Sequence, residues 1–200
     1  MAKKKRKTPT TKPAAASRLR AENARLKREL SGAERRIAEL EARADVDPLL
    51  DILNRRGFER ELKRSLAYVA RYGAEAALIY IDLDGFKAVN DRHGHATGDR
   101  LLKLVARTLV GHVRSSDVVG RLGGDEFAVL LWNISEALAH AKALQLEALI
   151  ADTATGTGPA RIAIGASAGV APLGPHQAPA QVIEAADKAM YARKAERHAI

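Results

Sequence analysis

The stretch RLGGDEFAVLL, residues 121–131, places two glycines and two acids directly before an apolar run. Gly123 and Gly124 join two strand-like runs, SDVVGRL and EFAVLLWN, which is the pattern of a tight β-hairpin. Such a turn needs positive φ, which glycine adopts without steric cost. We therefore expect a rigid hairpin whose tip carries Asp125 and Glu126, although an ordinary solvated turn would also hold acids.

The rest of the chain supplies elements that would pack around this hairpin. Apolar periodicity predicts helices over 55–72, 97–114, 135–152 and 178–198, with Ser135 as the N-cap of the third. Runs of strand-forming residues predict strands over 76–86 and 160–174. After the helix at 55–72 the order is β-α-β-β-α-β. This order predicts an α+β fold, a ferredoxin-like or palm-type antiparallel sheet with helices on one face.

Charge is spread unevenly along the chain. The 200 residues carry a net charge of +9, but residues 1–20 hold eight Lys and Arg and no acid, so the remainder carries only +1. The basic tail over 1–16 is polar and should be disordered, either solvated or bound to an anionic partner. The near-neutral remainder makes a nucleic-acid-binding domain an unfavoured reading. We expect residues 46–200 to form the functional domain.

Composition argues against cysteine-dependent sites, a membrane span and a secretory signal. The absence of cysteine excludes disulfides, thiolate catalysis and zinc–sulfur sites, and suits a cytoplasmic protein. No run of 18 apolar residues is present, so no membrane span is expected. The basic start has no apolar stretch behind it, so a secretory signal is not expected either.

Residues 17–45 carry a heptad pattern. Apolar residues recur at alternating spacings of four and three, and Asn23 stands at one a position, where a lone Asn commonly fixes a two-stranded register. The pattern predicts a parallel coiled coil; a single amphipathic helix packed on its own domain is the alternative. The seam comprises Leu19, Asn23, Leu26, Leu30, Ala33, Ile37, Leu40 and Ala44.

A second acidic stretch lies upstream of the hairpin. YIDLDGFKAVNDRHGHATGD, residues 80–99, ends an apolar strand with Asp82 and Asp84 on the same side. In a split βαβ fold this strand end lies beside the central hairpin, so Asp82 and Asp125 would meet. Two carboxylates at one place repel each other unless a proton or cation bridges them, and hard oxygen ligands suit Mg²⁺ with substrate phosphates. Lys87 can neutralise phosphate charge.

These motifs resemble the GGDEF family of diguanylate cyclases. The signature RLGGDEF, the upstream block DLDGFKAVNDRHGHATGD and their separation all agree with that family, over about Asp47 to Arg197. The lead-in DPLLDILNRRGF and the closing ADKAMYARK also resemble the family, with Leu50 where threonine is usual.

The resemblance implies that two GTP molecules, one on each of two facing domains, condense to cyclic di-GMP with release of pyrophosphate. It implies a two-metal mechanism in which two Mg²⁺ ions, with Mn²⁺ as an alternative, are held by Asp82, the Leu83 carbonyl and Asp125. Asp125 is also the family's candidate general base, although a metal ligand makes an unusual base. The remaining implied substrate contacts are Lys87, Asn90, His95, Asp99, Gly123, Gly124 and Lys194.

At some of these positions a purely structural role is the alternative to a functional one. A lone histidine such as His95 is more often structural, and Glu126 could hold the hairpin through an ion pair. The family usually continues K-x-x-G-R-N after the lysine, whereas here no glycine follows Lys194 and Arg197 stands one residue early, which leaves its phosphate contact open.

RSSD, residues 114–117, stands six residues before Gly123 and resembles the family's product-inhibition site. Arg114 would stack on or fork to guanine, and Asp117 would accept from guanine N–H groups. The alternative is a helix-to-strand turn with a local ion pair.

Three functions are compared: an active cyclase, a catalytically weak GGDEF module that acts as a receptor for cyclic di-GMP or GTP, and a structural or nucleic-acid-associated protein. The expected assembly is a homodimer through the coiled coil and facing GGDEF domains, with the input signal supplied by the coil or by a separate sensor protein.

Overall fold

The computed structural model describes residues 18, 20, 22–32, 36, 45–155 and 162–198. Its contacts divide the chain into two units, Met1–Ala44 and Asp45–Ile200, and each is described here by itself. The tail over 1–16 lies outside the described residues.

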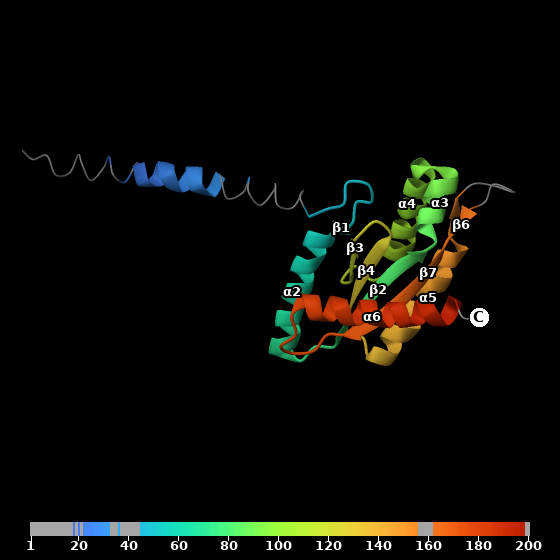
Figure 1. Cartoon of the computed structure of the whole chain (residues 1–200). Helices are drawn as coiled ribbons and strands as arrows, with labels where there is room; N and C mark the ends of the chain where they lie inside the picture. Colours follow the sequence, from blue (N-terminus) through green and yellow to red (C-terminus); the bar gives the residue numbers. More distant parts are fainter. Residues whose placement is uncertain are drawn as a thin grey trace, which may run out of the picture. The chain divides into compact units, whose positions relative to one another are not determined.

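A five-stranded sheet forms the centre of the second unit (Figure 1). Its order is β1-β3-β4-β2-β7, and every pairing is antiparallel except that of β1 with β3. The strands are β1 (Leu53–Asn54), β2 (Ala76–Asp84), β3 (Val118–Arg121), β4 (Glu126–Trp132) and β7 (Gly165–Pro172). The expected α+β class and antiparallel sheet are thus confirmed, and β2 lies in the centre between β4 and β7.

In the described part of the second unit, five helices and a small hairpin accompany this sheet. The helices are α2 (Arg55–Tyr72), α3 (Phe86–His93), α4 (His95–Gly111), α5 (Glu136–Asp152) and α6 (Pro179–His198). The small two-stranded hairpin pairs β5 (Ala154–Thr155) with β6 (Ile162–Ala163).

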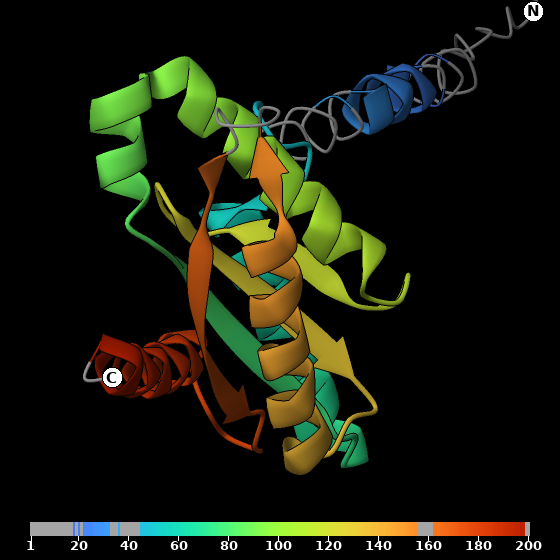
Figure 2. The same cartoon turned by 90° about the vertical axis from the view of Figure 1, so that its right-hand side faces the viewer.

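The expectation that helices cover one face of the sheet is wrong. Ile79 and Phe127 belong to one apolar core with residues of α4 and α5, whereas Leu78 and Leu130 belong to a second core with residues of α2 and α6. Helices accordingly lie on both faces of the sheet (Figure 2). The physical reason is the composition of β2, whose first six residues are all buried, as befits a strand covered on both faces.

The helix ends follow ordinary capping chemistry. Asn54 Oδ1 accepts a hydrogen bond from Gly57 N at 3.0 Å, and α2 ends where Gly73 takes φ 65°. Ser135 Oγ accepts from Leu138 N, so the expected N-cap of α5 is present. The predicted bounds of α2 match the structure, whereas the predicted helix over 97–114 begins earlier, at His95, and is preceded by the unpredicted α3.

The signature turn differs from the expected two-residue hairpin. The last β3–β4 pair is Arg121 with Phe127, so residues 122–125 form the connection. Among the described residues, the glycines with positive φ are Gly73, Gly85 and Gly94, so Gly123 and Gly124 do not use that freedom. The close neighbour of Gly123 is instead the end of the Glu126 side chain, which would have to shift to make room for a Cβ there.

The outer strand β7 is tied to both neighbouring helices. Ala168 N donates to Glu147 Oε1 of α5 at 2.8 Å, and Glu147 Oε2 lies 3.6 Å from Arg193 Nη2 of α6. Gly169 lets α6 approach β7 closely, because a Cβ there would overlap the backbone of Ala186 and Met190. The backbone of α6 is therefore held directly against the sheet.

The first unit is described over a short helical stretch. Residues 22–32 are helical, and the side chains of Leu26 and Leu30 are 52% and 59% exposed. The remaining apolar seam positions, Leu19, Ala33, Ile37, Leu40 and Ala44, lie outside the described residues. A search of the described part of the chain finds no helix with the length and apolarity needed to cross a membrane.

Candidate active site

Two carboxylates stand at the end of β2. Asp82 and Asp84 are the partly exposed positions of an otherwise buried strand. The Lys194 ammonium of α6 contacts Asp82 Oδ1 and lies 3.8 Å from Asp84 Oδ1, while Ser167 Oγ of β7 donates to Asp84 Oδ1 at 3.0 Å. Three elements distant in sequence therefore converge on this strand end.

Asp125 lies beside this pair. Leu83 N donates to Asp125 O at 3.2 Å, and Asp82 is paired in register with Glu126. Burial, together with the negative charge of Asp82, raises the pKa of the Asp125 carboxyl above its ordinary value. The pKa of Lys194 is also raised: burial opposes its charge, but the hydrogen bond to Asp82 and the surrounding carboxylates outweigh that opposition.

The donor set here fits a hard divalent cation. Asp82, Asp125 and the Leu83 carbonyl offer oxygen ligands, and burial together with the charge of Asp82 raises the pKa of Asp125, which a bound cation would offset. The Lys194 ammonium at Asp82 shows that a cation is already attracted to this place. Within the described residues no cluster of three or more His, Cys, Asp or Glu side chains that could hold a metal ion occurs.

The residues expected to bind guanine lie on the α3–α4 helical hairpin. Asn90 Oδ1 is buried without a hydrogen-bond partner in the structure, which is costly unless a ligand N–H satisfies it. Gly98 packs against it, since a Cβ there would overlap the Asn90 amide. His95 and Asp99 are exposed and stand four residues apart on α4, and Lys87 is exposed on α3.

Two arginines bind the backbone carbonyls of the signature turn. Arg121 Nε donates to Gly123 O at 2.9 Å, and its Nη2 donates to Gly124 O at 2.7 Å. Arg55 Nε donates to Leu122 O at 2.7 Å. Three successive carbonyls of the turn are thus bound by guanidinium groups.

Glu126 is held within the domain. Its Oε2 lies 3.7 Å from Arg55 Nη2, and its carboxylate forms a hydrogen bond with the buried Tyr80. Burial and this hydrogen bond raise the pKa of the Tyr80 hydroxyl. These contacts match the interpretation in which Glu126 stabilises the hairpin.

Arg114 and Asp117 lie in the turn between α4 and β3. Asp117 Oδ2 accepts from Arg114 N at 2.9 Å, and its Oδ1 accepts from Trp132 N at 3.1 Å. The Arg114 side chain is exposed, and both residues line a groove of about 550 Å³. Asp117 is therefore engaged in the fold, which leaves Arg114 as the more available of the two.

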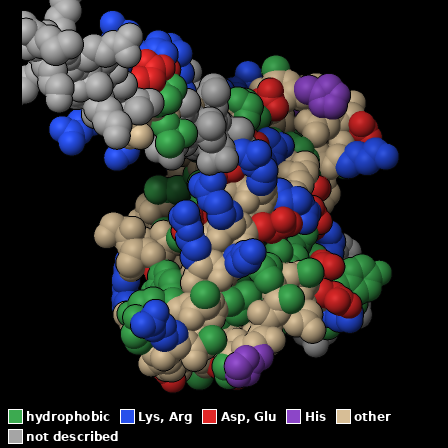
Figure 3. All heavy atoms as spheres, turned by 90° about the vertical axis from the view of Figure 1, so that its left-hand side faces the viewer, with side chains coloured by type: hydrophobic (Ala, Val, Ile, Leu, Met, Phe, Trp, Pro, Cys, Tyr) green, Lys and Arg blue, Asp and Glu red, His purple; other side chains and the backbone are tan. Residues whose placement is uncertain are grey.

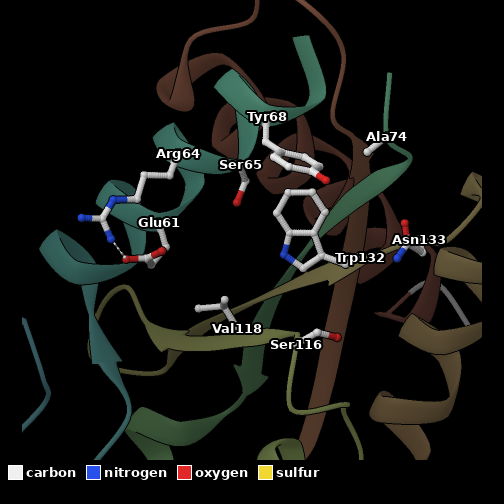
Figure 4. A pocket seen from close by; sticks show the side chains of 9 residues that line it. All are labelled: Glu61, Arg64, Ser65, Tyr68, Ala74, Ser116, Val118, Trp132 and Asn133. Atoms are coloured by element: carbon white, nitrogen blue, oxygen red, sulfur yellow. Dashed lines mark hydrogen bonds and ion pairs between the residues drawn. The ribbon is translucent and has the colours of Figure 1, made fainter. Parts of the chain in front are cut away.

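A separate pocket of about 510 Å³ lies between α2 and the ends of β3 and β4 (Figure 4). Tyr68 and Trp132 meet edge to face across it, with ring centroids 5.5 Å apart. The Glu61–Arg64 ion pair closes one side (Figure 4). None of the predicted site residues lines this pocket.

Lys and Arg side chains gather on the face of the domain that α2 forms (Figure 3). The exposed basic residues of α2 are Arg55, Arg56, Arg60, Lys63, Arg64 and Arg71. Two of them, Arg56 and Arg60, form ion pairs with the buried Asp45. The domain thus carries a local basic face although its net charge is near zero.

Several structural partners of the site were not predicted. Ser167 contacts Asp84, Tyr80 contacts Glu126, Arg121 contacts the signature turn, and Asp47 contacts Arg121. Arg121 is the first residue of the signature RLGGDEF, and Asp47 begins the lead-in motif, so their positions were the available signals. Arg197 lies in the last turn of α6, and its side chain is outside the described residues.

Comparison with known proteins places this geometry in a family. The family model described as "Diguanylate cyclase, GGDEF domain" matches residues 44–199. The chain is 40% identical over 160 residues to "Probable diguanylate cyclase DgcE" of Escherichia coli K12, which covers 79% of this chain and 14% of that protein. It is 39% identical over 166 residues to "Diguanylate cyclase TpbB" of Pseudomonas aeruginosa, covering 78% of this chain and 37% of that protein. The chain thus spans well under half the length of these relatives.

Solved structures give the same result. The coiled coil and GGDEF domain of DgcB from Caulobacter crescentus, in complex with c-di-GMP, has a TM-score of 0.74 at 26% identity and covers 89% of this chain and 95% of that chain. Diguanylate cyclase SiaD from Pseudomonas aeruginosa, in complex with its activator SiaC, has a TM-score of 0.73 at 28% identity, covering 92% and 73%.

Proposed function

The chain belongs to the GGDEF-domain family, and we propose that it is a diguanylate cyclase that condenses two GTP molecules into cyclic di-GMP. The observation that carries the proposal is the meeting of Asp82 and Asp125 at the end of β2, tied together by the Leu83–Asp125 backbone hydrogen bond. We place this reaction in the cytoplasm, where GTP is available.

The reaction consists of two equivalent substitutions. In each, the 3′-hydroxyl oxygen of one GTP bonds to the α-phosphorus of the other, and the bond from that phosphorus to the bridging oxygen breaks to release pyrophosphate. Asp82, Asp125 and the Leu83 carbonyl would hold Mg²⁺ or Mn²⁺, which when bound polarises the α-phosphate and lowers the pKa of the attacking hydroxyl. We assign Asp125 to cation binding first, and the hydroxyl proton leaves to it or to solvent.

Positive side chains would stabilise the charge that develops on the phosphates. Lys194 already lies within 3.8 Å of Asp84 and contacts Asp82, so a phosphate bound at this strand end would come within its reach. Lys87 is exposed at the start of α3, close in sequence to the same strand end. Both can neutralise phosphate oxygens in the transition state.

Guanine would be recognised by the α3–α4 hairpin. The unpartnered Asn90 Oδ1 can accept a hydrogen bond from one guanine N–H group, and the Asp99 carboxylate can accept hydrogen bonds from two such groups. His95, at the start of the same helix, would support this base site. Gly123 and Gly124 would let the nucleotide lie close to the turn.

Turnover requires two domains, because one unit presents a single Asp82–Asp125 pair. We propose that the helix of the first unit joins two chains as a parallel coiled coil and so raises the effective concentration of partner domains. The exposure of Leu26 and Leu30 supports this, as apolar seam residues are exposed when a partner helix is not there. The SiaD complex with its activator supports a separate protein partner as the source of the input signal.

Product feedback is the regulatory part of the proposal. Cyclic di-GMP would bind the groove that Arg114 and Asp117 line, and Arg114 would make the principal contact because both oxygens of Asp117 accept backbone hydrogen bonds. An arginine can stack on a guanine base or fork onto its edge.

The direct test is incubation of the purified chain with GTP and Mg²⁺, with cyclic di-GMP measured by chromatography. Asp82→Ala and Asp125→Ala should each abolish product, whereas the exposed Glu184→Ala, which loses only a local pair with Lys188, should keep it. Near-normal turnover by either aspartate variant would overturn the site. Nucleotide binding by the wild-type chain without turnover would favour the receptor function.

A further inference from the structure

Arg121 contacts two different parts of the domain at once. On one side its guanidinium donates to Gly123 O at 2.9 Å and to Gly124 O at 2.7 and 3.2 Å. On the other side its Nη1 lies 3.1 Å from Asp47 Oδ2. The two side chains are only 18% and 14% exposed, so this ion pair is shielded from solvent more than the surface pairs of α2.

Asp47 in turn holds the segment that leads into the domain. Its Oδ1 accepts from Leu49 N at 2.9 Å and from Leu50 N at 3.0 Å, and its own N–H donates to Ile52 O at 2.8 Å. Leu50 replaces the usual threonine of the family, and its side chain packs against the apolar core between the sheet and helices α4 and α5. One aspartate therefore joins this lead-in turn, residues 45–52, to Arg121.

The contacts of Arg121 determine how the peptide groups of the signature turn are oriented. In a trans peptide the carbonyl and the following N–H point in opposite directions. Because Arg121 binds the carbonyls of Gly123 and Gly124, the N–H groups of Gly124 and Asp125 point away from it. A planar guanidinium with several donors can hold two carbonyls and a carboxylate together, which a lysine ammonium cannot do with the same geometry.

We propose that Arg121 is a positioning residue for the signature turn, and that its ion pair with Asp47 makes the placement of Gly123–Asp125 depend on the lead-in turn. Arg121 acts on catalysis through the turn and touches no reacting atom. A movement of residues 45–52 would reach Asp125 through Asp47 and Arg121, which gives a signal arriving along the chain a short path to the site. The expected changes in kcat rest on the proposed cyclase activity, whereas the positioning of the turn by Arg121 does not.

The test compares Arg121→Gln, Asp47→Asn, the double variant and a matched control, Arg64→Gln, at an exposed ion pair on α2. Rates are measured against GTP concentration, and hydrogen exchange is measured at Leu122 and Leu83, whose amides bond Glu126 O and Asp125 O. Arg121→Gln should lower kcat by about ten- to a hundredfold, as expected for a displaced catalytic group, with little change in KM. It should also speed exchange at both amides.

Asp47→Asn is the decisive variant, because it keeps every hydrogen bond from Arg121 to the turn. It should lower kcat by about two- to fivefold, the worth of a partly shielded ion pair, and should speed exchange at Leu122. The double variant should be no slower than Arg121→Gln alone, and Arg64→Gln should match the wild type. Unchanged kcat and exchange in Asp47→Asn, or losses that multiply in the double variant, would overturn the inference. If the wild type makes no cyclic di-GMP, the proposed function fails, and the exchange data alone decide the inference.

Discussion

Replacing Gly169 by alanine tests how closely α6 must approach the sheet. A Cβ at this position would lie 2.7 Å from the Ala189 carbonyl carbon, and closer still to Ala186 O and Met190 N. These are backbone atoms that cannot rotate away, so the helix must move out by roughly 1.5 Å to restore ordinary contact. Overpacking of this kind costs about 1–3 kcal/mol. For a domain of this size each kcal/mol lowers the Tm by about 2–4 °C, so we expect a fall of about 2–12 °C.

Thermal unfolding followed by circular dichroism measures this directly. The matched control is Gly111→Ala at the end of α4, where a Cβ would meet nothing within 4 Å and the Tm should stay the same or rise. Lys194 lies one helical turn beyond Met190, so Gly169→Ala should also lower cyclase activity by moving its ammonium from Asp82. A Tm equal to that of the wild type would refute the packing argument.

Three further outcomes are expected. Because burial and Asp82 raise the pKa of Asp125, its ionised form opposes folding at neutral pH, and stability is regained as the pH falls through the raised pKa. Asp125→Asn should therefore raise the Tm at pH 7 in chelator while abolishing turnover; a lower Tm would contradict the charge argument. Arg114→Ala should keep the initial rate but let product accumulate further before turnover slows, unless the groove binds no cyclic di-GMP, in which case both progress curves coincide. Deleting residues 1–44, which leaves the buried Asp45 in place, should lower specific activity at dilute protein and recover it in part at higher concentration, so full activity at nanomolar protein would exclude a role for the helix in assembly.

Local patterns predicted much of the fold. The bounds of α2, the N-cap at Ser135 and the strands β2, β3 and β4 follow from short-range periodicity and capping, which depend on residues close in sequence. The second covered face was missed, although the uninterrupted apolar run of β2 indicates a strand buried on both sides. Periodicity alone does not say which helix lies on which face.

The sequence likewise predicted some residues of the candidate site and missed others. Residues within motifs, such as Asp82 and Asp125, could be named because spacing and chemistry are visible in the sequence. The support for them could not be named, because Arg121 reaches Asp47 across 74 residues and Ser167 reaches Asp84 across 83. Such contacts depend on the assembled sheet, so the motifs indicate that Arg121 and Asp47 matter but not that their side chains meet.

The hydrogen bond from Ala168 to Glu147 has a consequence for how copies of this chain can meet. β7 is an outermost strand, and an outer strand with free amides is a template for pairing with another chain. Here the Glu147 carboxylate of α5 accepts a hydrogen bond from one of those amides, and Pro172 at the end of the strand has no N–H group to donate. At the opposite edge, β1 is only two residues long. Continuous sheets running from one molecule into the next are thereby discouraged, so at high concentration the domain is protected from fibre-like growth.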